Sequence, residues 1–172
     1  MAQDINSPDY TIGVIGTGTM GRGIAQISVV GGYKVKMFDA QEDAAAKAEE
    51  FIHRMVNRAA EKGQITEGEA EAAAGRLAIV NSLSEMGDCS LVIEAIVENL
   101  DVKRAVFSEL EGIVAEDAIL ASNTSSLSVT QIAAGCGKPE RVAGYHYFNP
   151  VPLLKVVEVV DGQMTANWVA DK

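Results

Sequence analysis

Short apolar runs alternate with longer amphipathic segments from residue 10 onward. The short runs are rich in β-branched residues and end at glycine, proline or polar residues, which predicts buried strands. The longer segments carry the apolar spacing and the terminal signals of helices. The predicted strands are Tyr10–Gly16, Lys34–Phe38, Arg76–Val80, Ser90–Glu94, Ala118–Ser122, Arg141–Phe148 and Leu154–Val160. The predicted helices are Thr19–Val30, Gln41–Lys62, a short helix opened by Thr66 and Glu69, Asn99–Ala115 and Ser128–Ala134.

The alternation of strands with helices predicts the class of the fold. Strand–helix–strand units connect with right-handed crossovers and build a mostly parallel sheet. We therefore predict an α/β, doubly wound protein with helices on both faces of the sheet and one domain over residues 1–172. The residues after Val160 have the pattern of a further element that is incomplete. We therefore expect Trp168 to lie outside the core.

Composition and charge narrow the possible partners. The 172 residues suit one domain, and 48% hydrophobic with 22% charged residues is typical of a globular protein. A net charge of −10 argues against nucleic acid as a partner. Cys89 and Cys136 lack the spacing of a metal site, so we expect free thiols and no metal. No stretch resembles a signal peptide or a membrane span of about 20 apolar residues, so we expect a cytoplasmic protein without membrane contact.

A glycine-rich turn, GTGTMG, joins the first predicted strand to the first predicted helix. Alone this pattern is weak, but between a strand and a helix it is typical of Rossmann-type dinucleotide binding. The first glycine permits the tight turn, the second lets a pyrophosphate approach the backbone, and the third lets the helix pack closely on the sheet. The predicted cofactor-binding residues of the turn are Gly16, Gly18, Thr19, Met20 and Gly21.

Asp39 stands at the end of the second predicted strand, about 20 residues after the turn. A carboxylate there accepts hydrogen bonds from the adenosine ribose and repels a 2′-phosphate. Neither Ala40 nor Gln41 is basic, so the pattern favours NAD over NADP. FAD shares the glycine pattern, but nothing later in the chain supports it.

The candidate chemistry follows the fifth strand. His146 lies near the end of a predicted strand, where open α/β sheets bind ligands. If the chain folds back around Pro152, His146 faces Glu158, and a carboxylate fixes the tautomer of the imidazole. Such a pair can remove a hydroxyl proton while a hydride leaves for a nicotinamide. Ser125, after the fifth strand, is a hydroxyl suited to bind the reacting oxygen.

Each of these signals has a structural alternative. A histidine in an apolar strand is often a core residue, Asn149–Pro150 is a common turn, and SNTSS is a common loop composition. Their joint occurrence behind a dinucleotide motif favours the catalytic interpretation.

The blocks GTGTMGRGIAQ, EAIVEN, SNTSSL and HYFNPVPLLKVVEVV resemble the NAD-binding domain of the L-3-hydroxyacyl-CoA dehydrogenase family, over nearly the whole chain. The resemblance implies hydride transfer between NAD and the 3-hydroxy or 3-keto position of an acyl-CoA. It implies that His146 is the general acid/base, Glu158 its partner and Ser125 a contact of the substrate oxygen. The other residues that it assigns are Asn149 near the reacting oxygen, and Glu98, Lys103 and Asn123 at the cofactor.

The chain also departs from the family. Tyr147 follows His146 where phenylalanine is common, which preserves an aromatic side chain. Family members carry a helical C-terminal domain that covers the acyl cleft and makes most of the dimer contact. We expect that domain to be absent here, so that this chain is the cofactor-binding half of a protein that is a homodimer at full length.

A row of basic residues follows one side of the predicted helix Gln41–Lys62, in an otherwise acidic protein. Its members are Lys47, Arg54, Arg58 and Lys62. Long basic side chains often form a solvated flank. The family's acyl-CoA passes near this helix, which makes Arg54, Arg58 and Lys62 candidates for binding the CoA phosphates.

Two other functions remain open from the sequence. A dehydrogenase of a free hydroxy acid has a similar glycine turn, but those enzymes use a lysine base in a helix. A non-catalytic NAD-binding module has no need of an acid/base pair. The segment HYFNPVP and Glu158 favour the acyl-CoA enzyme.

Overall fold

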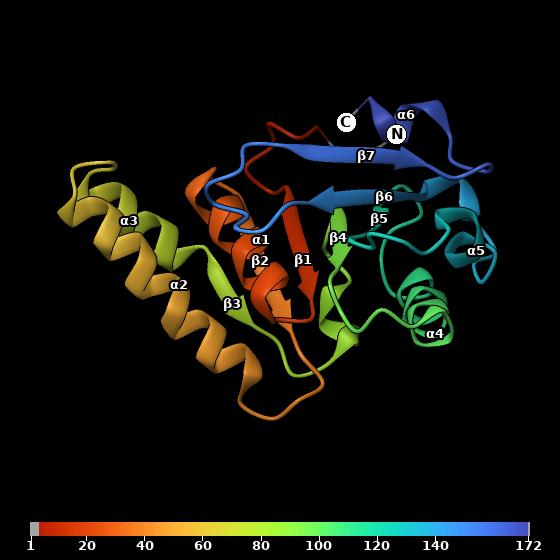
Figure 1. Ribbon diagram of the computed structural model, residues 1–172, viewed down its shortest axis with the longest axis horizontal. Coiled ribbons are helices and arrows are strands. Elements are labelled where there is room, and N and C mark those ends of the chain that lie inside the picture. Colours follow the sequence, from red (N-terminus) through yellow and green to blue (C-terminus); the bar gives the residue numbers. More distant parts are fainter. Residues whose placement is uncertain (1–3, 172) are drawn as a thin grey trace.

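The computed structural model describes residues 4–171, and within them the strands form one seven-stranded sheet in the order β3-β2-β1-β4-β5-β6-β7 (Figure 1). Strands β1 to β6 pair in parallel, and β7 runs antiparallel to β6. The strands are β1 (Thr11–Ile15), β2 (Lys34–Phe38), β3 (Leu77–Ile79), β4 (Leu91–Glu94), β5 (Ile119–Ser122), β6 (Val142–Tyr147) and β7 (Val157–Asp161). The predicted doubly wound, mostly parallel sheet is confirmed.

Helices cover both faces of the sheet because neighbouring strand residues point to opposite sides. In β1, Val14 packs in the apolar cluster with α1, α2, α3 and α6, whereas Ile15 packs in the cluster with α4 and α5. The α-helices are α1 (Thr19–Val30), α2 (Ala44–Glu61), α3 (Glu67–Gly75), α4 (Leu100–Glu111), α5 (Val129–Ala133) and α6 (Asn167–Ala170). Two 3₁₀ turns, Leu83–Met86 and Pro139–Arg141, precede β4 and β6.

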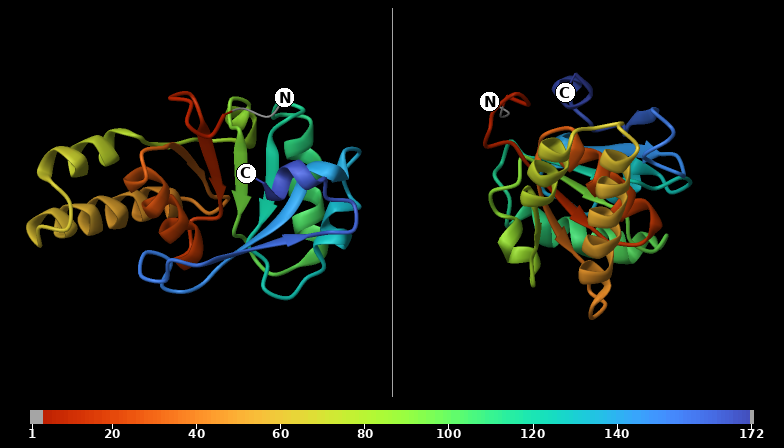
Figure 2. Two further views of the ribbon diagram at one scale, coloured as in Figure 1. Left: turned by 90° about the horizontal axis from the view of Figure 1, so that it is seen from above. Right: turned by 90° about the vertical axis from the view of Figure 1, so that its left-hand side faces the viewer.

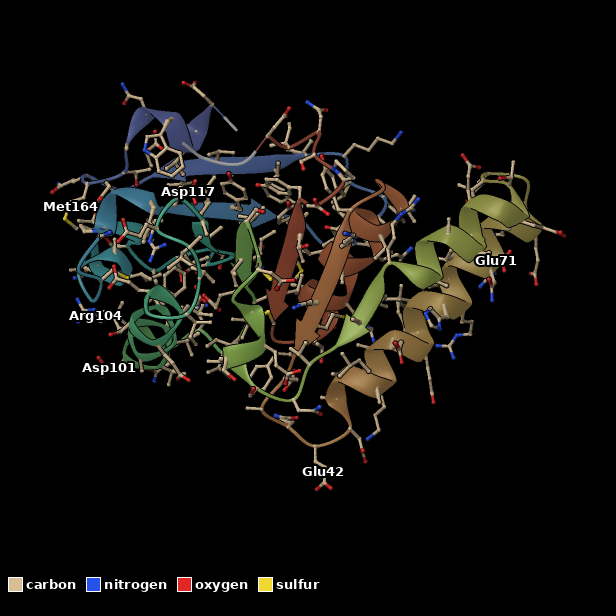
Figure 3. All side chains as sticks on the ribbon, turned by 180° about the vertical axis from the view of Figure 1, so that it is seen from behind. Glu42, Glu71, Asp101, Arg104, Asp117 and Met164 are labelled. Atoms are coloured by element: carbon tan, nitrogen blue, oxygen red, sulfur yellow. The ribbon has the colours of Figure 1, made fainter. Side chains whose placement is uncertain are left out.

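Helices α2 and α3 form a hairpin that projects beyond the edge of the sheet (Figure 2). The predicted capping box opens α3: the Thr66 hydroxyl accepts the Glu69 N–H, and the Glu69 carboxylate accepts the Thr66 N–H. Glu42, before α2, and Glu71, on α3, extend away from the protein (Figure 3). Among residues 4–171, no helix is long and apolar enough to cross a membrane.

Two helix boundaries differ by more than one residue from those predicted. The helix predicted from Gln41 begins at Ala44, because the Gln41 N–H donates to the Asp39 carboxylate and Asp43 takes a left-handed conformation with φ 60°. The helix predicted to reach Ala115 ends at Glu111, where Gly112 forms its C-cap. In both places local turn contacts compete with the helix. The hydrophobic periodicity of the sequence alone does not predict such contacts.

The C-terminal segment also differs from the prediction. Strand β7 begins at Val157 and returns the chain to the start of β6. The Ala166 N–H then donates to the Glu140 carbonyl, and α6 buries Val169 completely. Trp168, predicted to lie outside the core, is partly buried and packs against the main apolar cluster. The segment that follows β7 therefore packs back against the apolar cluster, which the sequence pattern did not reveal.

Candidate functional site

The glycine turn lies between β1 and α1, at the carboxyl edge of the sheet. Gly16 has φ 87°, and a Cβ there would lie 2.6 Å from the Ala95 carbonyl oxygen. A Cβ on Gly21 would lie 1.7 Å from the Gly16 carbonyl oxygen. A Cβ on Gly18 would meet nothing within 4 Å, so this residue borders open space. The turn thus needs glycine for close packing at two positions and leaves room for a ligand at the third.

The N-terminus of α1 faces the same space. Gly18 is its N-cap, no side chain caps it, and its first turn holds no acidic residue. The first backbone N–H groups of a helix have no partner within the helix and carry partial positive charge. These groups make the start of α1 suited to bind a phosphate.

Asp39 follows β2 beside the glycine turn. Its Oδ2 accepts the Thr17 N–H at 2.7 Å and the Thr17 hydroxyl at 2.9 Å, and its Oδ1 accepts the Gln41 N–H at 2.9 Å. Burial raises the pKa of Asp39, but the hydrogen bonds from Thr17 and Gln41 outweigh it and the pKa is lowered. The carboxylate is therefore charged, oriented and partly exposed at the position predicted for the ribose.

A pocket of about 390 Å³ opens next to the turn, at the carboxyl ends of β4, β5 and β6. It lies beside the boundary between β1 and β4, where the strand order reverses and ligands bind in open α/β sheets. Seven residues predicted for the site line it: Met20, Glu98, Lys103, Asn123, Ser125, His146 and Asn149. The structure therefore brings together residues from four separate segments of the chain.

His146 and Glu158 form a pair across two antiparallel strands. They are direct register partners in β6 and β7, and His146 Nδ1 lies 2.9 Å from Glu158 Oε2. The His146 ring also lies 4.7 Å from the Phe148 ring, measured between centroids. The histidine side chain is 23% exposed. The predicted juxtaposition of the two residues is confirmed.

The loop after β5 is fixed to both neighbouring strands. The Asn123 side-chain oxygen accepts the Tyr147 N–H at 2.9 Å, and the Asn123 N–H donates to the Glu94 carbonyl. Asn123 thus ties the loop that carries Ser125 to the end of the strand that carries His146.

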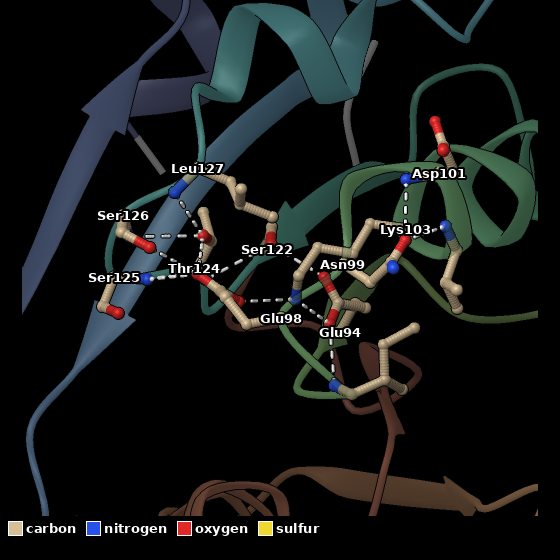
Figure 4. A network of polar contacts seen from close by, with 12 residues as sticks. Glu94, Glu98, Asn99, Asp101, Lys103, Ser122, Thr124, Ser125, Ser126 and Leu127 are labelled. Carbon is tan, nitrogen blue, oxygen red and sulfur yellow. Dashed lines mark hydrogen bonds and ion pairs between the residues drawn. The ribbon is translucent and has the colours of Figure 1, made fainter.

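Glu98 organises the same loop from the other side (Figure 4). Its carboxylate accepts hydrogen bonds from the Thr124 hydroxyl, the Ser125 N–H and the Ser126 hydroxyl, and it lies 3.2 Å from Lys103 Nζ. Burial raises the pKa of Glu98, but the Thr124 hydrogen bond and the Lys103 charge outweigh it and lower the pKa. The Ser125 side chain itself is exposed toward the pocket.

Glu94 is a residue of this network that the sequence analysis missed. It is fully buried at the end of β4, where it accepts from Lys103 Nζ at 2.6 Å, the Ser122 hydroxyl at 2.7 Å and the Ile96 N–H at 2.7 Å. Lys103 is only 1% exposed. In the sequence, Glu94 is only an acidic residue at the end of an apolar run. The same pattern is typical of a strand whose last residue is exposed to solvent.

The basic residues Arg54 and Arg58 on α2, and Lys62 at its C-cap, are exposed and do not line the pocket. Phe51 on the same helix lies under two guanidinium groups. The Arg22 guanidinium is 4.0 Å from the ring centroid and that of Arg54 is 5.5 Å. Arg22, which no sequence pattern singled out, connects the start of α1 to this basic row.

The chain is similar to known proteins in both sequence and structure. Residues 11–172 match the family model of the 3-hydroxyacyl-CoA dehydrogenase NAD-binding domain. The chain belongs to this family. It is 41% identical, over 94% of its length, to 3-hydroxyadipyl-CoA dehydrogenase of Escherichia coli strain K12, and 43% identical, over 87%, to 3-hydroxybutyryl-CoA dehydrogenase of Mycobacterium tuberculosis. A crystal structure of 3-hydroxybutyryl-CoA dehydrogenase from Escherichia coli K12 superposes with a TM-score of 0.92 over 94% of the chain, at 41% identity.

The chain spans about half the length of these relatives or less. It covers 34% of the Escherichia coli protein and 52% of the Mycobacterium tuberculosis protein. NAD is the cofactor of the family's domain, and the glycine turn fits it. Open space at Gly18, an uncapped helix start and an ionised Asp39 are the features that a dinucleotide needs here.

Proposed function

We propose that the protein carrying this chain interconverts (S)-3-hydroxyacyl-CoA and 3-ketoacyl-CoA with NAD as the hydride acceptor or donor. The observation that carries the proposal is the His146–Glu158 pair, 2.9 Å apart, beside a pocket that adjoins the glycine turn. The family membership and the names of the relatives support the same reaction.

In this proposal His146 moves the proton of the substrate hydroxyl. Its Nδ1 faces Glu158, so Nε2 is the nitrogen left to exchange a proton with a ligand. The Glu158 carboxylate holds the ring in this tautomer and stabilises the imidazolium that forms on oxidation of the alcohol. In the reverse direction the imidazolium returns the proton to the ketone oxygen.

Polar groups around the pocket orient the substrate oxygen and the nicotinamide. Ser125 donates its hydroxyl to the reacting oxygen, and Asn149, which lines the same pocket, contributes its amide. Asn123, Glu98 and Lys103 hold the nicotinamide end of the cofactor. NAD, when bound, supplies the acceptor for the hydride that leaves the carbon.

The remaining assignments concern the acyl-CoA and the whole protein. We assign the CoA phosphates to the row of Arg54, Arg58 and Lys62, which are exposed cations. Arg54 shares the Phe51 ring with Arg22, a residue near the start of α1. Residues 1–172 act as the cofactor domain, and a helical domain outside them covers the acyl group and carries a homodimer contact. The full protein works in the cytoplasm.

The test is acetoacetyl-CoA-dependent loss of NADH absorbance in the whole natural protein, with His146→Gln and Glu158→Gln as variants. We expect the loss of a general acid/base to lower kcat by about 10²–10⁴-fold in His146→Gln, with NADH affinity retained. Turnover of free acetoacetate but not its CoA ester would favour a hydroxy-acid dehydrogenase. NADH binding without turnover of either compound would indicate a non-catalytic module.

A further inference from the structure

Thr17 is the residue between the first two glycines of the turn, and it is 5% exposed. Both of its donors, the backbone N–H and the hydroxyl, reach the same oxygen of Asp39, at 2.7 Å and 2.9 Å. The glycine pattern of dinucleotide-binding turns requires no particular residue type at this position. The hydroxyl is therefore a contact that the glycine pattern itself does not explain.

The two Thr17 contacts determine how Asp39 meets a ligand. An ionised carboxylate has about four positions that accept hydrogen bonds. Thr17 occupies two of them on Oδ2, and the Gln41 N–H occupies one on Oδ1. The position that remains is on Oδ1, so the carboxylate can present only this oxygen to a ribose without breaking an existing contact.

A carboxylate that is fixed in this way discriminates between cofactors more strongly than a mobile one. A mobile aspartate can rotate away from a 2′-phosphate and reduce the repulsion between the two negative charges. Asp39 cannot rotate freely, because rotation would strand the buried Thr17 hydroxyl without an acceptor. The hydrogen bonds that lower the pKa of Asp39 also keep it charged.

We propose that Thr17 is a specificity-determining positioning residue, whose hydroxyl locks Asp39 in the orientation that accepts NAD and rejects NADP. The inference rests on the binding of NAD by this domain but not on the acyl-CoA reaction. It assigns part of the cofactor preference to a buried neutral side chain that does not itself need to touch the cofactor.

A purely structural role for Thr17 makes a different prediction. The hydroxyl also ties the β1–α1 turn to the end of β2, and a weaker tie would lower the affinity for both cofactors equally. A positioning role changes the ratio of the two affinities. The ratio of the dissociation constants for NADPH and NADH is therefore the deciding quantity.

The experiment measures NADH and NADPH binding to this chain by calorimetry, for the wild type, Thr17→Val and Thr17→Ser. Valine keeps the shape of threonine and removes the hydroxyl, whereas serine keeps the hydroxyl. We expect Thr17→Val to weaken NADH binding about tenfold, as for the loss of a hydrogen bond to a charged group, with NADPH binding unchanged or tighter. Thr17→Ser should keep the wild-type ratio, and Asp39→Asn should lower it at least as far as valine does.

Three outcomes would overturn the proposal. The first is a Thr17→Val variant with the wild-type ratio, and the second is an equal loss of both cofactors, which indicates a structural tie only. The third is a Thr17→Ser variant that behaves like valine. Thr17→Ala serves as a second hydroxyl-free variant if valine does not fold, with circular dichroism as the folding control. A wild-type chain that binds neither cofactor would refute the cofactor site itself, whereas the acyl-CoA reaction is tested separately by turnover.

Discussion

Lys103 carries a charge inside the protein, and its two carboxylate partners explain how. It is 1% exposed and lies 2.6 Å from a Glu94 oxygen and 3.2 Å from a Glu98 oxygen. Glu94 is fully buried, so the pair is stable only while both charges are present. The chain of contacts continues through Glu98 to the loop with Ser125, which makes a buried ion pair part of the support of the site.

The first prediction concerns this pair. Lys103→Met should lower the free energy of unfolding of this chain by about 3–5 kcal/mol, because it leaves the Glu94 charge buried without its cation. Urea denaturation measures the change. The matched control is the double variant Lys103→Met with Glu94→Gln, which removes both charges and should recover part of the loss. A single variant as stable as the wild type would show that Glu94 does not depend on Lys103.

The second prediction concerns pH. The pKa of Glu98 is lowered in the folded protein, so the folded state favours the ionised form. Its contribution is fully present above the unfolded pKa and is lost as the pH falls through the lower, folded value. We expect the stability difference between wild type and Glu98→Gln to be constant near neutral pH and to shrink below about pH 4. A difference that grows on acidification would contradict the sign of the shift.

At the scale of elements, the succession of strands and helices could be predicted because each element has its own periodicity and its own end signals. The exceptions arise from a local turn contact and from the packing of a distant segment. The turn at Gln41–Asp43 follows from the contact of Gln41 with Asp39, and the burial of Val169 follows from the antiparallel return of β7.

The pocket residues of the candidate site could be predicted from the sequence, but two of the buried residues that support them could not. Ligand-binding side chains gather at the carboxyl ends of parallel strands, which placed His146 and Ser125 correctly in one pocket. Glu94 and Thr17 were missed, since a buried carboxylate and a buried hydroxyl have the same local sequence pattern as exposed ones. Only their partners, Lys103 and Asp39, identify them.

The third prediction belongs to α2. Replacing Arg54 and Arg58 together by alanine should raise the apparent KM for acetoacetyl-CoA about tenfold in the whole protein and leave NADH affinity unchanged, because each arginine offers a charged hydrogen bond to phosphate. A control that removes the same charge elsewhere is Lys34→Ala with Lys138→Ala, whose side chains pair with Asp9 and Glu116. An unchanged KM would contradict a CoA-binding role and indicate that the basic row is only a solvated flank of α2.

At the scale of the whole molecule, the boundary between β1 and β4 separates two groups of candidate site residues. The glycine turn and Asp39 lie on one side of this boundary, and the pocket with His146 extends along β4, β5 and β6 on the other. A dinucleotide that spans the boundary would have its adenosine at Asp39 and its nicotinamide at the pocket. Proton transfer at His146 and hydride transfer at the cofactor would then take place at one location.

The central claim, a domain that binds NAD beside an acid/base pair, is tested most directly by calorimetric titration of this chain with NADH, followed by acetoacetyl-CoA. We predict saturable NADH binding in the micromolar range, with little or no heat from acetoacetyl-CoA, because the acyl group is assigned to a further domain. A chain that circular dichroism shows to be folded, yet that gives no heat with NADH, would contradict the assignment of the glycine turn and Asp39 to the cofactor.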